Sequence, residues 1–168
     1  MRRLHLLRHA KSSWSDHTLP DRDRPLAPRG RRAATQIARW AHRHRVRPKL
    51  VVSSGAVRAR ETLRGVLPGL GEPEVWIENA LYAASAETLL ERVRALPDEA
   101  EEAMVIGHNP GLGDLLLLLA APGKLRERAE TKVPTGALAT LEADVEHWAE
   151  LEPDGARLVS FVTPRELT

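Results

Sequence analysis

Short apolar runs of strand length recur along the first two thirds of the chain, and polar residues follow several of them. Leu4, Leu6 and Leu7 belong to the first run, which ends abruptly at Arg8 and His9. Further runs occupy residues 49–53, 74–78 and 103–107. Runs of this length that are apolar at most positions are typical of strands buried inside a parallel sheet.

Segments with the spacing of a helix lie between these runs. Ala33, Ile37, Ala38 and Ala41 recur every three or four residues, and Pro28 suits the first turn of a helix. This pattern predicts a helix over residues 28–44, and similar spacing predicts helices over 57–67, 85–96 and 111–121. Strand and helix therefore alternate four times, which indicates an α/β domain with a mostly parallel sheet.

The last third of the chain has a different pattern. Residues 137–141, 147–151 and 157–162 are short β-like runs with a turn at residues 152–155, whereas residues 122–132 are charged and predict a surface excursion. The expected fold is a single domain over residues 1–168. It is a three-layer sandwich with helices on both faces of a mostly parallel sheet and antiparallel strands at its C-terminal end.

The composition narrows the class of protein. The 168 residues are 42% hydrophobic and 29% charged and include no cysteine, which is typical of a soluble protein without disulfides or thiol chemistry. The longest apolar run, residues 115–121, is much shorter than a membrane span. The N-terminus is too interrupted by charge for a signal peptide, so we expect a cytoplasmic protein.

The charge is distributed unevenly along the chain. Residues 1–65 carry 17 Lys and Arg against 4 Asp and Glu, whereas residues 66–168 carry 8 against 19. Such a split fits either a basic half that meets nucleic acid or another polyanion, or two sides of one domain that neutralise each other. We favour neutralisation for most of this charge, and we expect no nucleic-acid partner.

Polar residues follow three of the predicted strands. Arg8 and His9 end the first strand, Arg58 follows the second, and His108 follows the fourth at the start of a helix. Because open α/β sheets bind ligands at the carboxyl ends of their strands, these four side chains are expected to converge. Asn109 and the turn after it add backbone N–H groups, which favour an anion.

This set of residues fits phosphoryl transfer. Arg8 and Arg58 offer paired N–H donors to the oxygens of a phosphoryl group, while neutral His9 attacks the phosphorus and His108 donates a further hydrogen bond. Positive charge beside His9 favours its neutral form. The scheme requires no metal and no cofactor.

Four ordered motifs carry a resemblance to a known family. The chain is similar to the histidine phosphatase superfamily, and to its SixA-type phosphohistidine phosphatases, at residues 7–14 (LRHAKSSW), 21–30 (DRDRPLAPRG), 53–62 (SSGAVRARET) and 107–111 (GHNPG). The resemblance implies a phosphoglycerate mutase-like fold. It also implies that His9 is phosphorylated transiently, that Arg8, Arg58 and His108 form the phosphate pocket, and that water hydrolyses the intermediate.

The chain departs from the superfamily pattern in two places. Ala10 stands where many members have glycine, a form familiar in the SixA-like branch. Phosphomonoesterases and mutases of the superfamily usually carry an acid after the third strand, and here only Glu78 is available as a proton donor. An alkoxide leaving group benefits from such an acid, whereas the labile P–N bond of phosphohistidine needs less help.

Three functions remain open from the sequence. The first is a phosphatase for phosphohistidine in a protein, with a role in phosphotransfer signalling. The second is a phosphomonoesterase for a small sugar or nucleotide phosphate, and the third is a non-catalytic module that binds a phosphorylated ligand. The sequence favours the first and predicts no oligomeric state.

Overall fold

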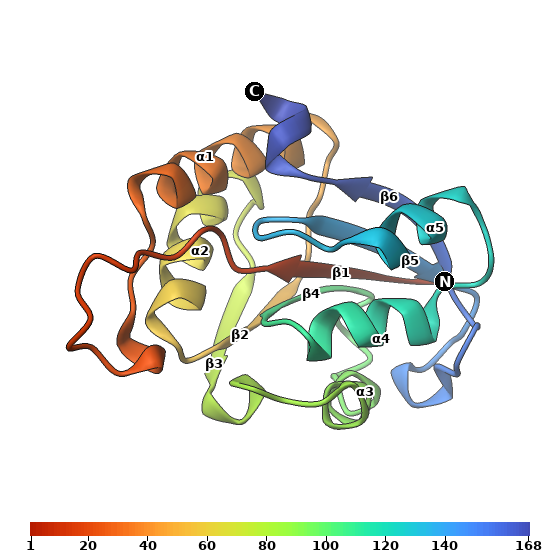
Figure 1. Cartoon of the computed structure of the whole chain (residues 1–168). Helices are drawn as coiled ribbons and strands as arrows, with labels where there is room; N and C mark the ends of the chain where they lie inside the picture. Colours follow the sequence, from red (N-terminus) through yellow and green to blue (C-terminus); the bar gives the residue numbers. More distant parts are fainter.

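One mixed sheet of six strands organises the molecule, in a computed structural model that describes residues 1–168 (Figure 1). The spatial order is β3-β2-β4-β1-β5-β6. The first four strands in sequence are mutually parallel, and β5 runs antiparallel to its neighbours β1 and β6. The strands are β1 (Arg2–Arg8), β2 (Leu50–Ser54), β3 (Glu74–Glu78), β4 (Glu102–Gly107), β5 (Leu138–Ala143) and β6 (Arg157–Val162).

Helices cover both faces of this sheet (Figure 1). One face carries α1 (Pro28–Arg43) and α2 (Val57–Val66), and the other carries α3 (Ala86–Arg94) and α4 (Gly111–Leu119), with α5 (Lys124–Thr131) near β6. The expected α/β sandwich with antiparallel C-terminal strands is confirmed. No helix combines the length and the apolar character needed to cross a membrane.

The central strands are apolar at most positions because both of their faces are buried. In β4, Ala103 and Val105 belong to the core beneath α3 and α4, whereas Met104 and Ile106 belong to the core beneath α1 and α2. Strand β2 alternates in the same way, with Val51 facing the α1 and α2 side. Side chains of successive strand residues point to opposite faces, so a strand between two helix layers needs apolar residues on both.

The C-terminal third differs from the prediction at two places. Residues 122–132 lie at the surface as expected, but they contain a helix that was not predicted, α5, which buries only Ala129 and is held by Arg126, whose guanidinium donates to carbonyls of Leu117 and Ala120. The β-like run predicted over residues 147–151 is wrong, because this segment is a 3-10 turn around the buried Trp148. The indole N–H of Trp148 donates to the carbonyl of Ala100 and anchors this turn.

Candidate active site

The end of β1 lies beside the end of β4, and this pairing brings two histidines together. Arg8 pairs with Gly107 in the parallel register, and the His9 amide donates to the Gly107 carbonyl at 3.1 Å. His9 and His108 therefore leave adjacent strands at the same edge, with their ring centroids 5.2 Å apart. Both side chains are buried, at 6% and 7% exposure.

Arg58 reaches this edge from the first turn of α2. The helix begins at Val57, shortly after β2 ends at Ser54, so Arg58 is buried against the ends of the central strands. Thr62 joins the two segments, because its hydroxyl accepts a hydrogen bond from the Ala10 amide at 2.9 Å and donates to the Arg58 carbonyl at 2.7 Å. Thr62 thus holds the segment that carries His9 against the helix turn that carries Arg58.

One hydrogen bond of the His9 ring fixes its tautomer. Its Nδ1 lies 2.7 Å from the Ala10 carbonyl oxygen. A carbonyl oxygen only accepts, so Nδ1 must carry the proton and donate it. In the neutral ring, Nε2 is then left with a free lone pair, which is the state that a nucleophile requires.

Both histidines have pKa values far below the ordinary value for an imidazole. Burial lowers the pKa of His9 to about 3, and the neighbouring histidine and two arginines act in the same direction, whereas the bond to Ala10 opposes them. Burial and then the charge of Arg58 lower the pKa of His108 to about 4. Since a low pKa disfavours the protonated ring, both side chains are neutral at physiological pH.

Three buried side-chain atoms of the site have no hydrogen-bond partner in the protein. They are Nε of Arg8, Nε of Arg58 and Nδ1 of His108. Leaving a buried polar group unpaired costs about 1–3 kcal/mol, so folded proteins rarely retain three of them in one place. All three belong to residues that the sequence assigns to the phosphate pocket, and an oxyanion would satisfy them.

Asp21, which the sequence analysis did not single out, contacts the site from the long loop between β1 and α1. Arg58 donates to the Asp21 backbone carbonyl at 2.7 Å and to its carboxylate at 3.0 Å. The carboxylate also accepts from Arg24, on whose guanidinium the exposed Trp14 stacks. The hydrogen bond from the Tyr82 hydroxyl, together with Arg58, holds the pKa of Asp21 well below its ordinary value.

Tyr82 and Ser54 are two further neighbours that the sequence analysis missed. The ring of Tyr82 meets His108 edge-on, with centroids 5.4 Å apart. The Ser54 hydroxyl lies 2.7 Å from Nε2 of His108 and orients its ring. Ser54 lies within one of the four motifs, but a short polar residue at a strand end gives no signal for this particular contact.

Glu78 lies at the end of β3, on the outer side of β2. Its two carboxylate oxygens accept hydrogen bonds from Nε and Nη2 of Arg92 at 2.7 and 2.8 Å. No hydrogen bond or ion pair joins Glu78 to the two histidines or two arginines of the pocket. The structure therefore does not bring the candidate proton donor into contact with the other candidate residues.

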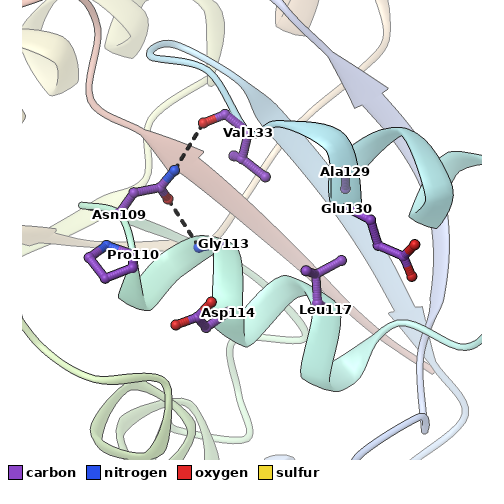
Figure 2. A pocket seen from close by; sticks show the side chains of 8 residues that line it. All are labelled: Asn109, Pro110, Gly113, Asp114, Leu117, Ala129, Glu130 and Val133. Atoms are coloured by element: carbon purple, nitrogen blue, oxygen red, sulfur yellow. Dashed lines mark hydrogen bonds between the residues drawn. The ribbon is translucent and has the colours of Figure 1, made fainter.

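Asn109 begins the turn that leads into α4, as Figure 2 shows. Its side-chain oxygen accepts from the Gly113 amide at 3.1 Å, and its amide nitrogen donates to the Val133 carbonyl at 2.9 Å. The same carbonyl accepts from Arg8 at 3.0 Å. Asn109 therefore ties the helix start to the segment that holds Arg8, and its amide is occupied by these contacts.

Comparison with known proteins identifies the family. The model of the histidine phosphatase superfamily (branch 1) matches residues 4–89, a stretch that includes His9 and Arg58. An uncharacterized protein of Mycobacterium tuberculosis is 37% identical over 163 residues, which cover 95% of this chain and all of that protein.

Solved structures agree with this match. A SixA protein of Agrobacterium tumefaciens is 31% identical, with a TM-score of 0.81 and coverage of 97% of this chain and 98% of that one. A SixA protein of Nakamurella multipartitia is 30% identical, with a TM-score of 0.83 and coverage of 97% and 96%. Their shared architecture is the phosphoglycerate mutase-like fold. On these sequence and structural similarities, the chain belongs to the histidine phosphatase superfamily.

Proposed function

We propose that this chain is a phosphatase that removes phosphate from phosphohistidine in a protein, with His9 as the nucleophile. The observation that carries the proposal is the coincidence of two features at one strand edge. Nε2 of His9 has a free lone pair because Nδ1 donates to Ala10. Beside it, Arg8, Arg58 and His108 each hold a buried polar atom without a protein partner.

The reaction follows from these groups in two steps. In the first, Nε2 of His9 attacks the phosphorus, a P–N bond to His9 forms, and the P–N bond to the substrate imidazole breaks. The freed imidazole nitrogen takes a proton from solvent. In the second, water attacks the phosphorus, the bond to His9 breaks, and inorganic phosphate leaves with His9 neutral again. The two arginines stabilise the phosphoryl oxygens in both steps.

The carbonyl of Ala10 has a role in both steps. When Nε2 carries the phosphoryl group, the ring of His9 becomes cationic and its Nδ1–H becomes a stronger donor. The carbonyl already lies 2.7 Å from Nδ1, so the ring need not move to gain this stabilisation. Preorganised acceptors of this kind lower the barrier without a reorganisation cost.

The state of the nearby carboxylates favours phosphohistidine over a phosphate ester. Glu78 is bound by Arg92 at both oxygens, and the pKa of Asp21 is held low by Tyr82 and Arg58. Neither group is set up to protonate a leaving alkoxide, which is worth about 10²–10⁴-fold in phosphoester cleavage. The SixA proteins that resemble this chain are described as phosphohistidine phosphatases, which supports the same substrate class.

A panel of substrates tests this proposal. We expect kcat/KM for a phosphohistidine peptide to exceed that for a sugar phosphate by at least about 10²-fold, because only the ester requires an acid. An aryl phosphate should lie between them, since its leaving group is activated. The measurement is phosphate release by the purified chain at equal substrate concentrations.

The Glu78→Gln variant separates this proposal from the phosphomonoesterase alternative. We expect this change to leave the phosphohistidine rate within about twofold, because no hydrogen bond or ion pair joins Glu78 to the pocket. A strong loss on the sugar phosphate, with the aryl phosphate spared, would instead identify Glu78 as a proton donor to an ester. Phosphate binding with no turnover on any substrate would indicate the non-catalytic module.

A further inference from the structure

A strongly basic groove of about 620 Å³ lies between the start of α1, the segment before β5 and the C-terminal turn. The cations that line it come from four separate parts of the chain, and no acidic residue lines it: they are Lys11, Arg29, Arg32, Lys132 and Arg165. Gln36 and three threonines add polar groups to the lining, and Ala33, Pro134 and Pro164 are apolar. Figure 1 shows the C-terminal turn beside α1, where these elements meet.

The five cations form no ion pair within the protein. Some basic residues elsewhere do pair with acids, as Arg3 of β1 does with Glu102 and Glu142. Glu166, the nearest acid in sequence to Arg165, is instead bound by Arg128 and by the hydroxyl of Thr163. The expected neutralisation of the basic half by the acidic half therefore does not extend to this groove, because no ion pair joins its five cations to an acid.

One segment forms a wall of both the groove and the candidate active site. Lys132, Pro134 and Thr135 line the groove, whereas the carbonyl of Val133, between them, accepts from Arg8. The next residue, Gly136, donates its amide to the carbonyls of Arg8 and His9 at 3.0 and 2.9 Å. Lys11 lies two residues after His9 and continues the opposite wall. The groove and the candidate active site are thus neighbours that share the segment before β5.

We infer that this groove docks an acidic segment of the phosphorylated protein next to its phosphohistidine. This inference rests on the proposed function, and it names the surface by which the enzyme would select its protein substrate. The phosphoryl group itself is assigned to Arg8 and Arg58, so the five further cations serve other anions. Carboxylates spaced along a polypeptide match cations spread over four elements, and such charges steer association and select partners.

The lining argues against the other ligands that a basic groove can hold. Single-stranded nucleic acid binds through aromatic side chains that stack on bases, and none of the lining residues is aromatic. Pockets for small molecules are lined mostly by apolar and aromatic side chains, whereas nine of the twelve residues that line this groove are charged or polar. An acidic polypeptide needs neither feature.

Two synthetic peptides and two variants test the inference. The first peptide carries one phosphohistidine flanked by Glu and Asp, and its twin has Gln and Asn at the same positions. The groove variant is Arg29→Glu with Arg32→Glu. The matched control is Arg60→Glu with Arg64→Glu, which reverses the same charge at two exposed, unpaired arginines of α2 outside the groove.

The wild type should hydrolyse the acidic peptide with a kcat/KM at least about tenfold above that of the twin, mainly through a lower KM. The groove variant should lose this advantage, and the control should keep it within about twofold. Raising the salt concentration from about 0.02 to 0.3 M should also abolish the preference of the wild type for the acidic peptide, because salt screens exposed charges. Equal kcat/KM for the two peptides, or equal losses in both variants, would overturn the inference.

A binding measurement separates failure of this inference from failure of the proposed function. His9→Ala protein is titrated with the fluorescent acidic peptide, its twin and a single-stranded DNA of equal charge. Tighter binding of the acidic peptide supports docking of an acidic segment in the groove. If the wild type then hydrolyses neither peptide, only the proposed function is refuted. Hydrolysis without any preference in binding would refute the groove alone, as would tighter binding of the DNA.

Discussion

At the scale of single residues, one hydrogen bond and the burial of the ring determine the tautomer and the protonation state of His9. Donation from Nδ1 to the Ala10 carbonyl selects the tautomer, and burial keeps the ring neutral. The sequence predicted a neutral nucleophile from the neighbouring arginines. The structure gives burial as the larger cause, a quantity that depends on the packing of distant segments and has no signature next to His9 in the chain.

The titration of the histidines tests this description. His9 and His108 should remain neutral down to about pH 5, because their pKa values are lowered to about 3 and about 4. His147, whose pKa is raised by the carboxylate of Asp98, is an internal control that should titrate above the ordinary value. The measurement is the ¹⁵N shifts of the imidazoles by NMR between pH 4 and 8. Titration of His9 together with His147 would contradict the description.

Asp21 is the residue whose removal should most affect the pocket without touching the reacting atoms. Asp21→Asn removes the charge that pairs with Arg58, so we expect kcat/KM to fall about tenfold and the inhibition constant of inorganic phosphate to rise by a similar factor. Asp23→Asn, two residues further in the same loop, removes a carboxylate that forms no ion pair. If both variants behave alike, Asp21 does not position Arg58.

At the scale of elements, the sequence predicts the strands and helices whose apolar residues are buried in the two cores. It misses the elements that side-chain hydrogen bonds hold in place. The four parallel strands and the helices α1 to α4 follow from apolar periodicity, which the two cores require. Helix α5 depends on Arg126, which reaches back to carbonyls of the preceding segment, and the turn at Trp148 depends on an indole N–H that reaches Ala100, which is distant in the chain. The same limit applies to the site, where the strand ends located Arg8, His9 and His108 but not Asp21 or Tyr82.

The segment before β5 gives a prediction at this scale. Gly136 has a φ of +77°, and a Cβ there would lie 2.6 Å from Cγ of Pro164. Gly136→Ala should therefore lower the free energy of unfolding by about 1–3 kcal/mol, as measured by urea denaturation. It should also reduce activity, because the Gly136 amide holds the carbonyls of Arg8 and His9. Gly123→Ala, where a Cβ meets nothing within 4 Å, serves as the control; equal stability of the two variants would contradict the argument.

At the scale of the whole molecule, the sheet places two neutral histidines, the half-buried Arg8 and the buried Arg58 at one edge and leaves unpaired cations beside them. The charge split along the chain predicted that the two halves neutralise each other. Ion pairs between the halves involve residues of β1, such as Arg2 with Asp98, and none involves a cation of α1. Linear charge counts cannot resolve this difference, because it depends on which residues the fold brings within reach.

The central claim is that His9 carries the phosphoryl group during turnover, and trapping that intermediate tests it most directly. Wild-type protein is mixed with a ³²P-labelled phosphohistidine peptide, quenched in base within milliseconds, digested and analysed by mass spectrometry. Our account predicts an acid-labile, base-stable phosphate on His9 that forms and decays at the rate of turnover, and none in His9→Ala, which should also lose hydrolysis. Undiminished turnover in His9→Ala, or label on another residue, would contradict it.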